Sequence, residues 1–297
     1  MMLKQRVAIV TGAGGGLGRA HALLLARYGA RVVVNDMNLD AASRVAEEIV
    51  AGGGQAIAIA ASVTDETKVA VMVDQVMGTW QRVDILINNA GILRDKSFSK
   101  MSLEDFRIVL DVHLMGAVIC CKSVWEIMRG QRYGRILMTT SSSGLYGNFG
   151  QSNYAAAKMA LVGLMQTLAI EGEKYNVRVN CLAPTAATQM TQGVLSQQAL
   201  SQLDPKLVSP GLLALVREDA PTRAILCSGA GHFARAYVTL TKGHQIGGDS
   251  SAGERVIEKW DLVSDPAEQI VPAYGFKQAE LELASAGCEA PTMAEAR

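Results

Sequence analysis

The chain has 297 residues, of which 49% are hydrophobic and 19% are charged, and its 28 Lys and Arg balance its 28 Asp and Glu. This composition supplies a large core and excludes a chain that is mostly disordered. A net charge of zero, without a run of basic residues, argues against nucleic acid as the main partner.

Short β-branched runs alternate along the chain with longer segments of helical periodicity. Strands are predicted at 7–10, 31–35, 55–60, 83–87, 134–140 and 176–182, with a last strand at 237–240. Helices are predicted between them at 17–28, 40–51, 65–79, 103–128 and 152–174. This alternation predicts a parallel sheet covered on both faces, which is a doubly wound, Rossmann-type α/β fold in a single domain.

Residues 183–222 break the alternation, because they hold four of the seven prolines. We assign residues 1–250 to the Rossmann-type domain, with 183–222 as a substrate loop, and 251–297 to a C-terminal helical extension with a mobile tail. The apolar residues of the loop are Met190, Val194, Leu195, Leu200, Leu203 and Leu207. They would close over an acyl chain and exclude water, with a fixed pair of covering helices as the alternative.

No metal site or disulfide framework is predicted. The five cysteines are odd in number and lack CxxC spacing, and the four histidines form no HExxH pattern. These features favour a reducing compartment, and we expect a cytoplasmic location. No apolar run approaches the about 20 residues of a membrane span, so we expect no membrane partner.

A glycine-rich turn follows the first predicted strand and opens the first helix. Glycine allows positive φ and close approach of a pyrophosphate, and the helix N-terminus offers free N–H groups. Between a strand and a helix, such a turn predicts a dinucleotide site rather than a merely flexible turn. The cofactor-binding candidates in this turn are Gly12, Gly14, Gly15, Gly16, Leu17 and Gly18.

Asp36 follows the second predicted strand and is the candidate partner of the adenine ribose. Its carboxylate can accept hydrogen bonds from the ribose hydroxyls and would repel a 2′-phosphate. Because its neighbour Met37 is neutral, NAD is favoured over NADP. A helix-capping or turn residue is the alternative. Asn89, Ala90 and Gly91 follow the fourth predicted strand and are placed to pass beneath the cofactor.

Tyr154 and Lys158 are four residues apart at the start of a predicted helix and therefore share a face. As an ammonium, Lys158 would lower the pKa of the phenol, so that Tyr154 gives or takes a proton near neutral pH. Ser141 lies at the end of the strand predicted before this helix. Its hydroxyl can hold the same substrate oxygen in place.

Together these motifs resemble the short-chain dehydrogenase/reductase family over roughly residues 5–245. The family pattern is carried by Thr11-Gly12-x-x-x-Gly16-x-Gly18, Asn88-Asn89-Ala90-Gly91, Ser141 and Tyr154-x-x-x-Lys158. The resemblance implies alcohol–ketone redox with a nicotinamide cofactor, with Tyr154 as the acid/base and Ser141 positioning the carbonyl. It also implies that Tyr154 and Lys158 contact the cofactor, with Lys158 holding the nicotinamide ribose.

Two further segments, Asn89–Asp95 and Tyr146–Gln151, together with Met190-Thr191-Gln192, narrow the resemblance. They are similar to the (3R)-hydroxyacyl-CoA dehydrogenase domain of peroxisomal multifunctional enzyme (D-bifunctional protein) and to its stand-alone bacterial relatives. This branch implies an acyl-CoA substrate. The family implies a homodimer or homotetramer that associates through the helices predicted at 103–128 and 152–174. Packing of these helices against the sheet of the same chain is the alternative and takes part of that surface.

The sequence departs from the family pattern at three places. His113 stands where the family usually has a catalytic Asn, so it is a catalytic candidate that contacts a proton-relay water, or else a buried packing residue. Ser62, beside Val63, stands where the family often has an Asp that binds adenine. Pro184-Thr185 replaces the common Pro-Gly. We keep Ser62, Val63 and Pro184 as cofactor-binding candidates.

Three rival functions remain open at this stage. Two are enzymes, a 3-oxoacyl thioester reductase and a hydroxysteroid dehydrogenase. The third is a non-enzymatic scaffold that senses a dinucleotide, because fold alone does not determine function. The intact set of Ser141, Tyr154 and Lys158 argues against that scaffold, since a sensor needs only the phosphate turn.

Overall fold

One eight-stranded sheet organises the first 236 residues, with strand order β3-β2-β1-β4-β5-β6-β7-β8. The computed structural model describes residues 1–187 and 202–288. Neighbouring strands run parallel except β7 and β8, which form an antiparallel hairpin. The strands are β1 (Val7–Thr11), β2 (Arg31–Asp36), β3 (Gln55–Ala60), β4 (Ile85–Asn88), β5 (Gly134–Thr139), β6 (Val177–Thr185), β7 (Ile225–Gly229) and β8 (His232–Ala236).

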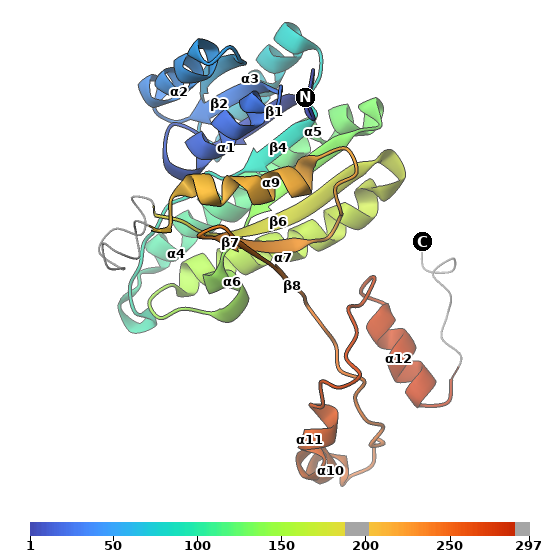
Figure 1. Ribbon diagram of the computed structural model, residues 1–297. Coiled ribbons are helices and arrows are strands. Elements are labelled where there is room, and N and C mark those ends of the chain that lie inside the picture. The colour runs from blue at the N-terminus through green and yellow to red at the C-terminus, as the bar shows by residue number, and fades with distance from the viewer. Residues whose placement is uncertain (188–201, 289–297) are drawn as a thin grey trace. The chain divides into compact units, whose positions relative to one another are not determined.

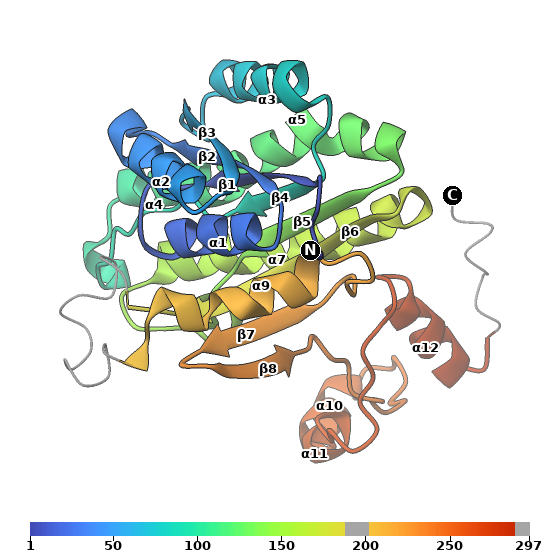
Figure 2. The same ribbon diagram turned by 45° about the horizontal axis from the view of Figure 1, so that its top comes forward.

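Helices cover both faces of this sheet (Figures 1 and 2). One face packs against α1 (Gly16–Arg27), α2 (Leu39–Ala51) and α9 (Ser209–Val216). The other packs against α3 (Glu66–Trp80), α5 (Gly116–Gln131) and α7 (Ser152–Gly172). Successive residues of β1 alternate between the two cores, as the pleat of a strand requires. The predicted doubly wound α/β class is confirmed.

The helix predicted at 103–128 contains a π-helical turn. It consists of α4 (Leu103–Leu110), the π turn Asp111–Met115 and α5. Such turns insert one residue into a helix and often occur at functional sites. By length and composition the helix Leu103–Gln131 could cross a membrane, because an 18-residue stretch within it has a mean hydropathy of 1.6. Its Cys120, Val124 and Met128 pack into the core beside the sheet, which accounts for the apolar composition.

The last predicted strand, at 237–240, is wrong. The sheet instead continues through β7 and β8 and ends at Ala236, while Leu240 forms only an isolated bridge with Ile270. The hairpin reverses at Ala230 and Gly231, both with positive φ. The residues of β8 are mostly exposed and form no continuous apolar run. The strand was therefore predicted at the more apolar residues 237–240.

The chain divides into two compact units, Met1–Ala236 and Tyr237–Arg297. The boundary lies at the end of β8 rather than at residue 250, because the last strand of the sheet belongs to the first unit. In the second unit the described helices are α10 (Ala252–Glu258), α11 (Trp260–Val263) and α12 (Lys277–Ser285). None of residues 237–288 is buried. The expected mobile tail falls largely on 289–297, outside the described residues.

Candidate active site

The predicted site residues gather along the carboxyl edge of the sheet, after β1, β2, β4 and β5 (Figure 1). The chain winds from β1 to β2 in one direction, and β4 lies on the other side of β1. In open parallel sheets this reversal leaves a crevice at the carboxyl ends, where ligands bind. The topology therefore brings the glycine turn and the Tyr154 region to one edge.

The glycine turn after β1 has the backbone that the sequence predicts. Gly12 and Gly16 have φ of +62° and +51°, which glycine adopts without strain. A Cβ on Gly18 would lie 2.2 Å from the Gly12 carbonyl oxygen, so the turn closes tightly on α1. A Cβ on Gly15 would meet no atom within 4 Å. The turn thus presents open backbone at Gly15, at the N-terminus of α1, with Leu17 behind it at the edge of the core.

Asp36 lies at the end of β2 with its carboxylate turned toward this glycine turn. Its Oδ2 accepts a hydrogen bond of 3.0 Å from the Gly14 N–H, and its Oδ1 accepts one of 3.0 Å from the Asn38 N–H. A Cβ on Gly14 would lie 2.8 Å from Oδ2, so glycine leaves room for the carboxylate. The adjacent Met37 is exposed and neutral. An acid is therefore fixed beside the turn, without a basic neighbour in sequence.

Asn89 joins the ends of β1 and β4. Its Nδ2 donates to the carbonyl oxygens of Thr11 at 2.9 Å and Gly12 at 3.2 Å. In return, the buried hydroxyl of Thr11 accepts hydrogen bonds from the N–H groups of Asn89 and Ala90, at 3.0 and 3.1 Å. The sequence placed Thr11 only within the turn motif. The structure shows that its hydroxyl ties the end of β1 to the loop after β4.

Ser62, Val63 and Pro184 also lie at this edge, but each has a local structural contact. The Ser62 Oγ is 2.9 Å from the Thr64 Oγ1, in the turn after β3. Val63 is buried against Gly116, where a Cβ would lie 2.6 Å from its side chain. Pro184 lies within β6, paired with β7. Their roles toward a cofactor stay predictions.

His113 is buried in the π turn and bridges two parts of the site. Its Nε2 lies 2.8 Å from the carbonyl oxygen of Ile92 and 3.1 Å from the Ile92 nitrogen. Its ring meets the ring of Tyr154 edge-on, with centroids 5.2 Å apart. A Cβ on Gly91 would lie 2.2 Å from His113 Cε1, so glycine is required there. His113 therefore packs under the loop after β4, and its packing role is visible.

The imidazole of His113 is neutral at physiological pH. Burial, together with the nearby charge of Lys158, lowers its pKa to about 3. Its buried Nδ1 has no hydrogen-bond partner among the described residues. A small cavity of about 10 Å³ touches His113, Lys158 and Asn88, and this is about the volume that one water needs. The contact between His113 and a relay water stays a prediction.

Ser141, Tyr154 and Lys158 come together as predicted. Ser141 caps the N-terminus of α6 (Ser142–Tyr146), directly after β5. Tyr154 and Lys158 are on the first turns of α7, and the Lys158 Nζ lies 5.4 Å from the centroid of the Tyr154 ring. Lys158 is buried, and its Nζ donates a hydrogen bond of 2.6 Å to the Thr139 carbonyl oxygen. An acid/base group, a hydroxyl donor and an amine thus share one site.

The expected lowering of the phenol pKa by Lys158 is wrong for the protein alone. Burial raises the pKa of Tyr154, although a hydrogen bond with Ser141 opposes this and the Asp95 carboxylate adds to it. Burial also lowers the pKa of Lys158 to about 7, so the amine is not a full charge near neutral pH. The i, i+4 spacing identifies the pair but cannot reveal how strongly the helix buries both groups.

Asn153, next to Tyr154, was missed by the sequence reasoning. Its buried side chain donates from Nδ2 to the carbonyl oxygens of Arg94 and Asp105, at 3.1 and 3.3 Å. Its Oδ1 accepts a hydrogen bond of 2.7 Å from the Tyr154 N–H. Asn153 therefore fixes the start of α7 against α4 and the loop after β4. An asparagine at a helix start is a weak signal, because most such residues only cap.

The predicted substrate loop is only partly described. Residues 188–201, which include Met190, Val194, Leu195 and Leu200, lie outside the described residues. The two flanks meet where the Ala187 N–H donates to the Leu203 carbonyl oxygen at 2.6 Å. After them come a 3-10 helix, Pro205–Leu207, and then α9. Closure over an acyl chain stays a prediction.

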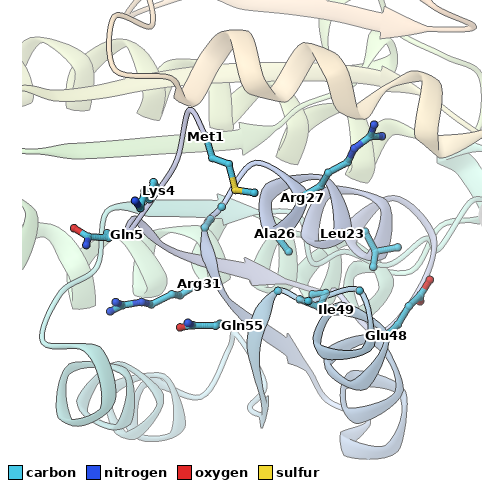
Figure 3. Close-up of a pocket in the computed structure, with 15 residues that line it drawn as sticks. Met1, Lys4, Gln5, Leu23, Ala26, Arg27, Arg31, Glu48, Ile49 and Gln55 are labelled. Carbon is cyan, nitrogen blue, oxygen red and sulfur yellow. The ribbon is translucent and has the colours of Figure 1, made fainter.

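A hollow of about 540 Å³ lies elsewhere, away from these residues (Figure 3). It opens at the amino ends of β2 and β3, between the C-terminal ends of α1 and α2. Arg27 and Arg31, which Figure 3 labels on its rim, point in different directions rather than toward one centre. Its position away from Tyr154 separates it from the chemistry. The reacting centre is therefore identified by its side chains and not by the volume of a hollow.

The residues at the carboxyl edge fit a nicotinamide dinucleotide. Open backbone at Gly15 suits a pyrophosphate at the N-terminus of α1, and the fixed Asp36 carboxylate suits ribose hydroxyls. No group of three or more His, Cys, Asp or Glu among the described residues is placed to hold a metal ion.

Known proteins show the same architecture. A family model described as short chain dehydrogenase matches residues 6–199. Peroxisomal multifunctional enzyme type 2 of Drosophila melanogaster is 44% identical over 273 residues, covering 88% of this chain and 45% of that protein. A solved structure of the full-length enzyme of that name superposes with a TM-score of 0.81 at 38% identity, over 96% of this chain and 50% of that chain. The chain spans 30% to 56% of the length of the curated multifunctional relatives that it matches.

Two further similarities cover nearly whole proteins. A putative short-chain type dehydrogenase/reductase of Mycobacterium tuberculosis is 42% identical, over 89% of this chain and 95% of that protein. A 7α-hydroxysteroid dehydrogenase solved with NADH and 7-oxo glycochenodeoxycholic acid superposes with a TM-score of 0.72 at 32% identity, over 77% of this chain and 94% of that chain. The chain belongs to the short-chain dehydrogenase family.

Proposed function

We propose that the protein interconverts a (3R)-3-hydroxyacyl-CoA and the corresponding 3-oxoacyl-CoA with NAD(H). The observation that carries the redox chemistry is the convergence of Ser141, Tyr154 and Lys158 beside the glycine turn. The acyl-CoA substrate is supported by the similarity to multifunctional peroxisomal enzymes and by the segments Asn89–Asp95 and Tyr146–Gln151. This assignment would place the protein in fatty acid metabolism.

The side chains divide the proton chemistry between them. In reduction, the Tyr154 hydroxyl gives its proton to the substrate carbonyl oxygen, while the Ser141 hydroxyl donates a hydrogen bond to the same oxygen. In oxidation, Tyr154 takes the proton from the alcohol. The bound dinucleotide supplies the hydride acceptor or donor. A protonated Lys158 stabilises the phenolate that Tyr154 becomes after giving up its proton, since an opposite charge favours the ionised form.

His113 and the small cavity would complete this proton path. A water in contact with the neutral imidazole and with Lys158 would accept or supply the proton that Tyr154 exchanges. The buried position and unpartnered Nδ1 support this role for His113. The Ile92 contact supports a second role, because it fixes the ring beneath the loop after β4.

NAD is the proposed cofactor in preference to NADP. The Asp36 carboxylate, fixed by the N–H groups of Gly14 and Asn38, would face a 2′-phosphate with like charge. Exposed Met37 offers no compensating positive charge. The protein would hold the pyrophosphate at the N-terminus of α1 and the ribose hydroxyls at Asp36.

We also propose a homo-oligomer in the cytoplasm. Exposed apolar residues on α4, the π turn and α7, namely Leu103, Ile108, Met115 and Met159, support association of the predicted helices. All five cysteines are free, which agrees with a reducing compartment.

A substrate panel tests the proposed function. The rates of NADH formation would be measured with (3R)- and (3S)-3-hydroxyacyl-CoA, with 3-hydroxyacyl carrier-protein thioesters and with hydroxysteroids. The proposal expects kcat/KM to be highest for the (3R)-acyl-CoA. A higher value for a steroid or for a carrier-protein thioester would assign the protein to that rival instead.

A further inference from the structure

Two loops near the start of α7 are held together by hydrogen bonds. One follows β4 and includes Arg94, Asp95 and Lys96, and the other leads into α7. The Lys96 N–H donates to the Gly150 carbonyl oxygen at 2.9 Å, and Asn153 Nδ2 donates to the Arg94 carbonyl oxygen at 3.1 Å. Asp95 lies between these two anchors on the chain, so its backbone is held on both sides.

The side chain of Asp95 is held as well. Gln151 Nε2 donates to Asp95 Oδ2 at 2.7 Å. The Oε1 of the same amide accepts hydrogen bonds from Ser143 Oγ at 2.7 Å and from Asn148 Nδ2 at 3.1 Å. Gln151 thus connects Asp95 to α6, the helix that Ser141 caps, and it stands three residues before Tyr154. An exposed carboxylate is thereby fixed relative to both Ser141 and Tyr154.

The phenol of Tyr154 has different charged and neutral groups on its different sides. Lys158 lies beneath its ring on α7, and neutral His113 meets the ring from the π turn. Ser141, at the end of β5, offers a hydrogen bond, and Asp95 offers an anion from the loop after β4. The nearby Arg94 and Lys96 pair with Asp105, at 3.8 and 2.9 Å, and not with Asp95.

We propose that Asp95, held by Gln151, is a positioning residue that fixes a negative charge near Tyr154 and adds to the preference of its phenol for the proton-donating form. This inference rests on the proposed acid/base role of Tyr154. A carboxylate near the phenol disfavours the phenolate, and Asp95 contributes to the raised pKa of Tyr154. The anion favours the form of Tyr154 that donates a proton, which is the form that ketone reduction requires.

The test compares Asp95→Asn, which removes the charge but keeps the shape, with Asp95→Glu, which keeps the charge. For alcohol oxidation, the rate rises with pH as Tyr154 loses its proton. We expect Asp95→Asn to move this rise to lower pH by about 0.5–1 unit, the scale expected for one partly screened charge. Asp95→Glu should remain near the wild-type profile. Unchanged profiles in Asp95→Asn, with only a lower kcat, would show a merely structural role and overturn the proposal.

The same pH profile, measured at high salt and in a Gln151 variant, gives two further tests. The shift caused by Asp95→Asn should shrink at about 1 M salt, where the screening length is only about 3 Å. In a Gln151→Ala background the same substitution should shift the profile less, because the carboxylate is no longer held. Equal shifts at both ionic strengths and in both backgrounds would contradict a fixed charge.

A substrate-free titration separates this inference from the proposed function. The absorbance of the Tyr154 phenolate is measured by pH titration of wild type and of Asp95→Asn. From each titration, the titration of the same protein with Tyr154→Phe added is subtracted. A lower pKa in Asp95→Asn supports the inference even if the protein turns over no acyl-CoA. An identical pKa in both proteins overturns it, whatever the substrate panel shows.

Discussion

The Nζ of Lys158 lies 2.6 Å from the carbonyl oxygen of Thr139, at the end of β5, and donates a hydrogen bond to it inside the core. The amine is buried, and burial lowers its pKa to about 7. The contact fixes the Lys158 amine beneath Tyr154. The pKa of this amine is nevertheless close to neutral pH. The same burial that serves the site therefore has a cost in stability.

The first prediction concerns this cost. In the unfolded chain lysine has a pKa near 10.4, so between pH 7 and 10 the unfolded state binds more protons than the folded state. The contribution of Lys158 to the free energy of unfolding therefore rises with pH across this window, by at most about 1.4 kcal/mol per unit. Lys158→Met should be more stable than wild type at pH 6, and the gain should shrink toward pH 10.

Chemical denaturation of the cofactor-free protein at several pH values measures this difference. Lys122→Met, at an exposed position of α5, is the matched control and should show a pH-independent effect. Parallel stability curves for wild type and Lys158→Met between pH 7 and 10 would refute the prediction. Lys158→Met should also lower the rate of alcohol oxidation, because the amine that lies 5.4 Å from the centroid of the Tyr154 ring is removed.

The second prediction concerns cofactor choice. Asp36→Ala removes the charge that opposes a 2′-phosphate, so affinity for NADPH should rise about tenfold, the factor that about 1.4 kcal/mol provides. Affinity for NADH should fall, because the ribose hydroxyls lose an acceptor. Fluorescence titrations of both cofactors provide the measurement. Met37→Ala, at the neighbouring exposed position, should change neither affinity, and a wild-type preference for NADPH would contradict the account.

The third prediction concerns the contact between Gly91 and His113. A methyl group on Gly91 would lie 2.2 Å from the imidazole, so Gly91→Ala should cost about 1–3 kcal/mol of unfolding free energy. Gly78→Ala, in an open position within α3, should be neutral or stabilising by up to about 1 kcal/mol. Thermal or denaturant unfolding compares the two variants.

A double variant shows whether the clash is the cause. In a His113→Ala background, Gly91→Ala should cost less than it does alone, because the ring that it would meet is gone. Equal costs in the two backgrounds would mean that the loop after β4 fails for a different reason. The activity of His113→Ala then reports separately on the proposed water contact.

Much of the fold follows from local pattern, because each buried parallel strand is a continuous apolar run and each helix ends near glycine or polar residues. β3 has the predicted bounds, and α1 and α2 lie within one residue of theirs. The π turn was not predicted, since one inserted residue leaves the apolar pattern of a long helix intact. The hairpin of β7 and β8 was missed because exposed β8 lacks an apolar run.

In the site, too, features set by neighbouring residues could be predicted, and features set by residues distant in sequence could not. The glycine turn, Asp36, Tyr154 and Lys158 are recognisable from spacing, since each motif is local to a strand end or a helix turn. The direction of the pKa shift of Tyr154 was predicted wrongly, because the shift depends on burial and burial depends on residues distant in sequence. Gln151 and Asn153 could not be assigned partners, because they bond to the loop after β4 and to α4, more than 45 residues earlier in the chain.

The central claim is that Tyr154 exchanges the proton at the substrate oxygen, and Tyr154→Phe tests it most directly. The measurement pairs turnover of the substrate that the panel identifies with the dissociation constant of NADH. The account predicts that kcat falls by about 10²–10⁴, the usual loss for general acid–base catalysis, while NADH binds as in wild type. Full activity in Tyr154→Phe, with NADH binding intact, would contradict it.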